Sequence, residues 1–78
     1  MAREQTVRVL AEMVANVIAL EVGVGDVVAA GDSVCLLESM KMEIPVLTEH
    51  PGTVTAIRVT PGDVVQEGDI LVELNGPS

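Results

Sequence analysis

The chain has 78 residues, enough for a single domain, and carries a net charge of −8 from 12 acidic and 4 basic residues. It contains no Phe, Tyr or Trp on which bases could stack, and its acidic surface repels phosphate, so we expect no binding to nucleic acid. Polar residues or glycines interrupt every apolar stretch well before the roughly 18 residues of a membrane-spanning helix, so we expect no membrane insertion.

The N-terminal segment and the cysteine content both favour the cytoplasm. Residues 1–6 contain no apolar segment of the kind found in signal peptides, and the single cysteine, Cys35, cannot form an internal disulfide. Because Cys35 lies in the apolar run 34–37, we interpret it as a small buried hydrophobic residue.

The apolar residues predict an all-β protein. The chain has 15 Val and 4 Ile, which favour strands, and no segment shows a sustained period of 3.6 residues. In chain order we expect strands near residues 6–11, 15–22, 27–28, 33–38, 42–47, 52–59, 64–65 and 70–74. Eight strands at this spacing predict two four-stranded antiparallel sheets in a sandwich or flattened barrel.

An internal repeat organises these elements. Residues 15–38 and 52–75 share ten identities at an offset of 37, including two Gly-Asp pairs in each copy. We interpret the Gly-Asp pairs as turns, since glycine tolerates positive φ and aspartate bonds the neighbouring backbone. The repeat predicts two similar halves related by an approximate two-fold axis, within one domain of residues 1–78 whose core spans about 7–74.

The segment that joins the two repeats holds the only lysine of the chain. It reads Glu38-Ser39-Met40-Lys41-Met42, and the flanking strands place Met40 and Lys41 at the tip of a hairpin. Two-residue hairpin turns usually contain Asn or Gly, so these residues would be mildly strained there. The residues alone leave two interpretations open: a reactive amine between exposed methionines, or an ordinary solvated turn over which the methionines fold back.

The motif resembles the attachment sequence of the biotinyl/lipoyl domain family, usually Glu-Ala-Met-Lys-Met, and the similarity covers about residues 7–74. It implies a barrel-sandwich hybrid fold with Lys41 on the hairpin between the halves. Lipoyl domains typically carry Asp-Lys-Ala at this place, so the methionines imply biotin, covalently bound to Lys41. Met40 and Met42 would then assist recognition and carboxyl transfer, and Glu38 would belong to the sequence read by the ligase.

The resemblance also implies partners and a role. A biotin protein ligase would modify Lys41, and the chain would carry a carboxyl group from a biotin carboxylase to a carboxyltransferase that acts on an acyl-CoA or keto acid. It would be a non-catalytic carrier and a monomer when free. The chain is most similar to the free-standing biotinylated proteins of actinobacteria. It departs from the usual family pattern at Glu12, Ala15 and Ser39, where Pro, Gly and Ala are common, but no functional group is lost.

Two other carrier or binding functions, and an enzymatic role, are alternatives to this one. The chain could be a lipoyl carrier of a 2-oxo acid dehydrogenase, or an unmodified module of the same fold that only binds a partner. An enzyme is disfavoured, because the only histidine, His50, precedes Pro51-Gly52 in an expected turn without a nucleophile arranged beside it. The carboxylates show no spacing that is typical of a metal site.

Overall fold

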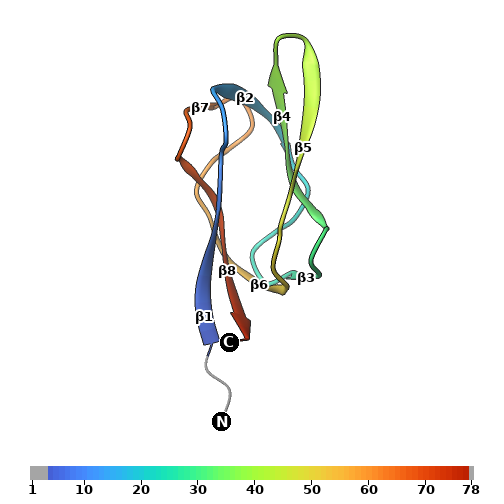
Figure 1. The fold of residues 1–78 in the computed structure, drawn as a ribbon, viewed down its shortest axis with the longest axis vertical. Coiled ribbons are helices and arrows are strands. Elements are labelled where there is room, and N and C mark those ends of the chain that lie inside the picture. Colours follow the sequence, from blue (N-terminus) through green and yellow to red (C-terminus); the bar gives the residue numbers. More distant parts are fainter. Residues whose placement is uncertain (1–3, 78) are drawn as a thin grey trace.

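The computed structural model describes residues 4–77, which form eight strands and no helix (Figure 1). Residues 1–3 and 78 of the expected domain lie outside this description. The strands are β1 (Glu4–Leu10), β2 (Ala15–Leu20), β3 (Val27–Val28), β4 (Ser33–Ser39), β5 (Met42–Leu47), β6 (Gly52–Ile57), β7 (Val64–Val65) and β8 (Ile70–Pro77). All eight expected strands are present, and their ends differ by a few residues. The expected ends were two residues too late for β2 and β6, whereas β8 continues three residues beyond 74 because it pairs with β1 as far as Glu4.

The strands form two antiparallel sheets with related strand orders. One sheet has the order β1-β8-β6-β3 and the other the order β5-β4-β2-β7. A shift of 37 residues converts β2 into β6, β3 into β7 and β4 into β8, so the two orders coincide, with β1 and β5 at equivalent edges. The expected quasi-two-fold sandwich of two four-stranded sheets is therefore confirmed.

The core lies between the two sheets and is built from repeat-related residues. The side chains of Leu37 and Leu74 are buried, as are those of Val17 and Val54. Cys35 is completely buried, as expected. Each apolar side chain that is removed from water contributes roughly 25 cal/mol per Å² of buried surface. Because the buried residues form repeat-related pairs, the two halves of the repeat supply equivalent parts of one core.

The Gly-Asp pairs close the turns between the strands, as the sequence predicted. The glycine of each pair has φ between 92° and 99°, a range that favours glycine over residues with a side chain: Gly25, Gly31, Gly62 and Gly68. Each following aspartate accepts a hydrogen bond from a backbone N–H three residues earlier, at 2.8–2.9 Å. These carboxylates therefore serve the turns.

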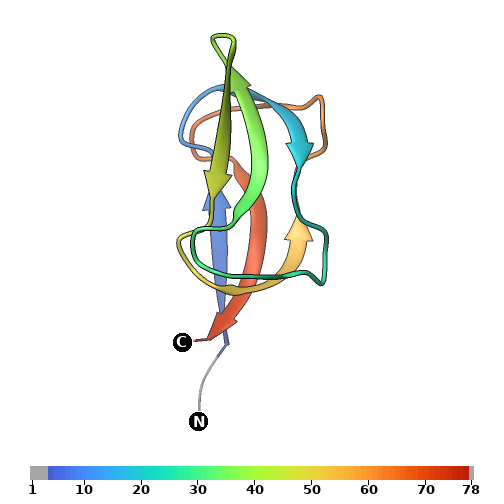
Figure 2. The same cartoon turned by 90° about the vertical axis from the view of Figure 1, so that its right-hand side faces the viewer.

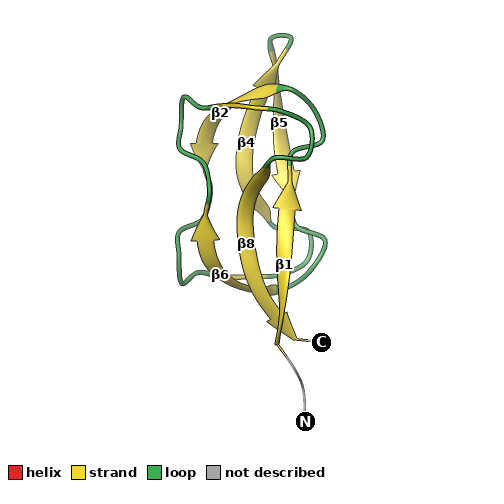
Figure 3. Cartoon of the chain, turned by 90° about the vertical axis from the view of Figure 1, so that its left-hand side faces the viewer, coloured by secondary structure: helices red, strands yellow, loops and turns green. Residues whose placement is uncertain are grey.

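The molecule is elongated, and its two ends differ (Figures 1 and 2). The hairpin between β4 and β5 projects from one end, whereas the described ends of β1 and β8 lie at the other. Met40 and Lys41 lie in the hairpin that connects the halves, at the end opposite the described ends of β1 and β8. Figure 3 shows β1 and β8 side by side, with β6 beyond β8, in the order given by the pairing.

Candidate functional site

The site is the turn that joins β4 to β5. Ser39 and Met42 are directly opposite each other, so Met40 and Lys41 form a two-residue turn. Their φ values are +53° and +65°, and they are the only non-glycine residues with positive φ among residues 4–77. Positive φ at both central positions is the geometry of a type I′ turn, which normally selects Asn and Gly. A side chain in this backbone region costs roughly 1–2 kcal/mol per residue, so the turn is strained, as expected.

The side chains of this turn are held in solvent. Met40 is 91% exposed and Met42 is 64% exposed, and Lys41 is exposed between them. The two ion pairs among the described residues both involve Glu73, so neither of them restrains the Lys41 amine. The hairpin extends beyond the rest of the sandwich (Figures 1 and 2), so a partner could approach the amine from several sides. The structure thus places Met40 and Met42 outside the core, rather than folded back over it as gap-fillers.

The base of the hairpin carries two carboxylates. Glu38 on β4 is directly opposite Glu43 on β5, and both residues are exposed. Glu38 is one of the predicted site residues, and the strand register adds Glu43 as its direct partner across the hairpin. The predicted site residues Glu38, Met40, Lys41 and Met42 therefore lie together on one hairpin, with Glu43 as an additional member.

The other reactive side chains form no second constellation within the described residues. His50 is exposed, and its backbone N–H and C=O are both bonded to the Thr48 hydroxyl, at 3.2 and 2.7 Å. Burial raises the pKa of the Cys35 thiol above its usual value, with a further contribution from the charge of Glu21, so this thiol is a poor nucleophile. No three His, Cys, Asp or Glu side chains of residues 4–77 gather as metal ligands.

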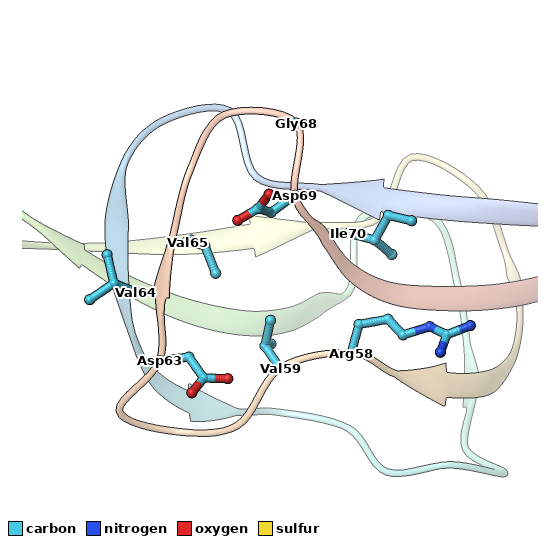
Figure 4. Close-up of a pocket in the computed structure, with 8 residues that line it drawn as sticks. All are labelled: Arg58, Val59, Asp63, Val64, Val65, Gly68, Asp69 and Ile70. Atoms are coloured by element: carbon cyan, nitrogen blue, oxygen red, sulfur yellow. The ribbon is translucent and has the colours of Figure 1, made fainter.

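A hollow between the loops around β7 is built from turn residues (Figure 4). Its lining includes Asp63 and Asp69. Each of these carboxylates already accepts a backbone hydrogen bond, from Thr60 and Gln66 respectively. The two carboxylates therefore stabilise the turns that surround the hollow. The described residues contain no helix long and apolar enough to cross a membrane.

Comparison with known proteins identifies the family. The chain belongs to the family described as biotin-requiring enzymes, whose model matches residues 7–74. The matched residues include the hairpin with the exposed lysine, and the family is described as requiring biotin. The hairpin fits a covalent group, because its only amine is exposed and lies on a strained turn that the core does not need.

Curated relatives and solved structures agree with this family. Biotinylated protein TB7.3 of Mycobacterium tuberculosis is 60% identical over 38 residues, which are 49% of this chain and 54% of that protein. A homologue in Mycolicibacterium smegmatis is 58% identical over the same shares. The matched segment thus spans about half the length of these relatives.

Two solved structures share the fold. A single-chain, multi-domain long-chain acyl-CoA carboxylase matches with a TM-score of 0.85 and 27% identity, over 91% of this chain and 7% of that one. The urea carboxylase of Kluyveromyces lactis matches with a TM-score of 0.85 and 31% identity, over 90% of this chain and 6% of that one. The chain is thus similar to a small part of each large carboxylase.

Proposed function

We propose that Lys41 carries biotin in an amide bond and that the chain is a biotin carboxyl carrier. The observation that carries this proposal is the only lysine of the chain, exposed on a two-residue turn at φ +65°. Membership in a biotin-requiring family supports biotin as the group, and the curated relatives are themselves named biotinylated proteins. The methionines on either side of Lys41 favour biotin over lipoate.

The attachment step requires little from the chain except access. A biotin protein ligase would present biotinyl-adenylate; the neutral Lys41 amine attacks its acyl carbon, AMP leaves, and the nitrogen gives up a proton as the amide forms. The net charge then changes from −8 to −9, since one ammonium group is lost. Lys41 is exposed in the turn of the hairpin, and the ligase must remove the proton of its amine.

The Lys41 side chain with biotin attached forms a long arm that would serve two enzymes in turn. When bound, biotin supplies a ureido nitrogen that carries the carboxyl group. The lysine and biotin chains together reach roughly 14 Å, judged from bond lengths. The chain would present this arm to a biotin carboxylase and to a carboxyltransferase, without catalysis of its own, and Met40 and Met42 would contact these enzymes. The similarity to carboxylases supports this role, and the acceptor would be an acyl-CoA or keto acid.

Substitution of Lys41 by Arg tests the attachment site. Lys41→Arg keeps a positive charge at an exposed position, so we expect an unchanged free energy of unfolding and complete loss of streptavidin binding after incubation with biotin protein ligase, biotin and ATP. Wild-type chain treated in parallel is the positive control. Streptavidin binding that persists in the arginine variant would refute the assignment, and a lipoyl group on the wild-type chain would favour the lipoyl carrier.

A further inference from the structure

A row of exposed residues crosses the outer face of the β5-β4-β2-β7 sheet at the base of the hairpin. The strand register places Val64 opposite Asn16, Asn16 opposite Glu38, and Glu38 opposite Glu43. All four residues are exposed. With neighbouring strands just under 5 Å apart, the row is roughly 14 Å long. We call these four residues the tip row.

The second half of the repeat supplies an internal comparison for the tip row. The equivalent positions in the other sheet are Val27, Thr53, Asn75 and Thr6, and the register there aligns them in the same way. We call these four the distal row, since they lie at the end away from the hairpin. The fold thus builds the same backbone feature twice, with different side chains.

The two rows differ in charge. Glu38 and Glu43 lie directly opposite each other, and like charges in that position destabilise a sheet. The equivalent pair in the distal row, Asn75 and Thr6, is neutral. The backbone therefore does not require two carboxylates at this position, and folding stability does not explain them.

Apolar surface lies at the other end of the tip row. Val64 is 65% exposed, and Figure 4 shows its side chain directed away from the interior, whereas Val65 points inward. Val14 is 61% exposed and directly precedes Ala15, the partner of Val65, so it lies at the same corner. An exposed valine alone is not distinctive, because Val27 of the distal row is 80% exposed. The combination of two valines with two carboxylates occurs only at the hairpin end of the repeat.

We infer that the tip row, together with Val14, is the surface on which biotin protein ligase docks, through an apolar patch flanked by basic side chains. This inference rests on the proposed function. The two carboxylates, on a chain of net charge −8, complement a basic surface and would accelerate the encounter. The valines would supply the buried centre of the contact.

The length of the Lys41 side chain before and after modification favours the ligase, among the enzymes that would bind this hairpin, as the one that docks on the tip row. Before modification, the reacting nitrogen extends from the backbone by only one lysine side chain, roughly 6 Å. The ligase must therefore approach the hairpin and the sheet below it. After modification the arm reaches roughly 14 Å, so a carboxylase can act on its end with less contact to the sheet.

Matched aspartate variants in the two rows test the docking surface. We expect Val64→Asp to lower kcat/KM for biotin transfer by about tenfold, because it places a charge in the apolar centre. Val27→Asp, at the equivalent position of the distal row, should stay within about twofold of wild type. The measurement uses purified biotin protein ligase, biotin and ATP, with streptavidin gel shift as the readout and thermal unfolding to verify both folds.

A charge variant provides a second readout that does not depend on packing. Glu43→Gln should lower the rate at low salt and weaken its dependence on ionic strength, whereas Thr6→Glu in the distal row should change neither. If wild-type chain is biotinylated and Val64→Asp and Glu43→Gln match it at all salt concentrations, the docking surface is wrong while the proposed function stands. If wild-type chain takes up no biotin, both are wrong.

Discussion

Met40 and Lys41 occupy a backbone conformation that glycine and asparagine adopt at lower cost. Their φ values are +53° and +65°, and the Met40 side chain is 91% exposed, so burial of that side chain does not offset the strain. Strained residues that the core does not need cluster at functional sites. This combination distinguishes the turn from the Gly-Asp turns, where glycine removes the strain.

Relief of the strain should stabilise the chain. Met40→Asn introduces a residue that tolerates positive φ, and we expect the free energy of unfolding in urea to rise by about 0.5 kcal/mol. Met42→Asn is the matched control, because Met42 lies in β5, where asparagine is disfavoured, and should lower it. A loss of stability in Met40→Asn equal to that of the control would show that the turn is not strained.

Some residue contacts could not be predicted from the sequence. Glu73 is only 8% exposed, and it pairs with Arg58 at 2.5 Å and with Arg8 at 3.6 Å. The repeat gave no indication of this cluster, because the residues equivalent to Glu73 and Arg8 are Leu36 and Pro45. By contrast, Lys41 could be singled out, since its type is unique and its position between the repeats predicts a turn.

For the strands, the repeat predicted the positions along the chain better than the pairing between strands. β2, β3 and β4 recur as β6, β7 and β8, including two strands of only two residues. β1 and β5 lie outside the repeated segments, so their equivalence at the two sheet edges emerged only from the structure. The pairing of β1 with β8 joins the first and last described strands, a contact that local patterns do not encode.

One close approach between strands depends on two glycines. A side chain at Gly76 in β8 would lie 2.6 Å from the carbonyl oxygen of Pro51, and one at Gly52 would lie 2.9 Å from that of Asn75. The equivalent positions in the other half are Ser39 and Ala15, so this approach is not a property of the repeat.

Gly76→Ala should therefore be costly. Backbone atoms must move to admit the methyl group, and we expect a loss of about 2 kcal/mol in the free energy of unfolding. Gly23→Ala is the control, because its added carbon would meet only Asp26 Oδ2, at 3.8 Å. Equal losses in the two variants, measured by urea unfolding, would contradict the role assigned to this approach.

In the whole molecule, the hairpin that carries Lys41 is separated from the end at which β1 begins and β8 ends. The hairpin with Lys41 lies at one end and the described ends of β1 and β8 at the other (Figure 1), so an enzyme at the hairpin need not contact the described ends of these two strands. The excess of acidic residues disfavours contacts between copies of the chain.

We accordingly expect the free chain to be a monomer. Sedimentation equilibrium at physiological salt should give a mass near 8.1 kDa, without dependence on protein concentration. A stable dimer would be a sign that an exposed sheet edge or the valines of the tip row associate with a second copy.

The attachment of biotin to Lys41 can be tested by the mass of the intact chain after co-expression with a biotin protein ligase in the presence of biotin, followed by peptide mapping. We expect the addition of one biotinyl group, located on the peptide that contains Lys41. An unmodified chain, or a biotinyl group on any other residue, would contradict it.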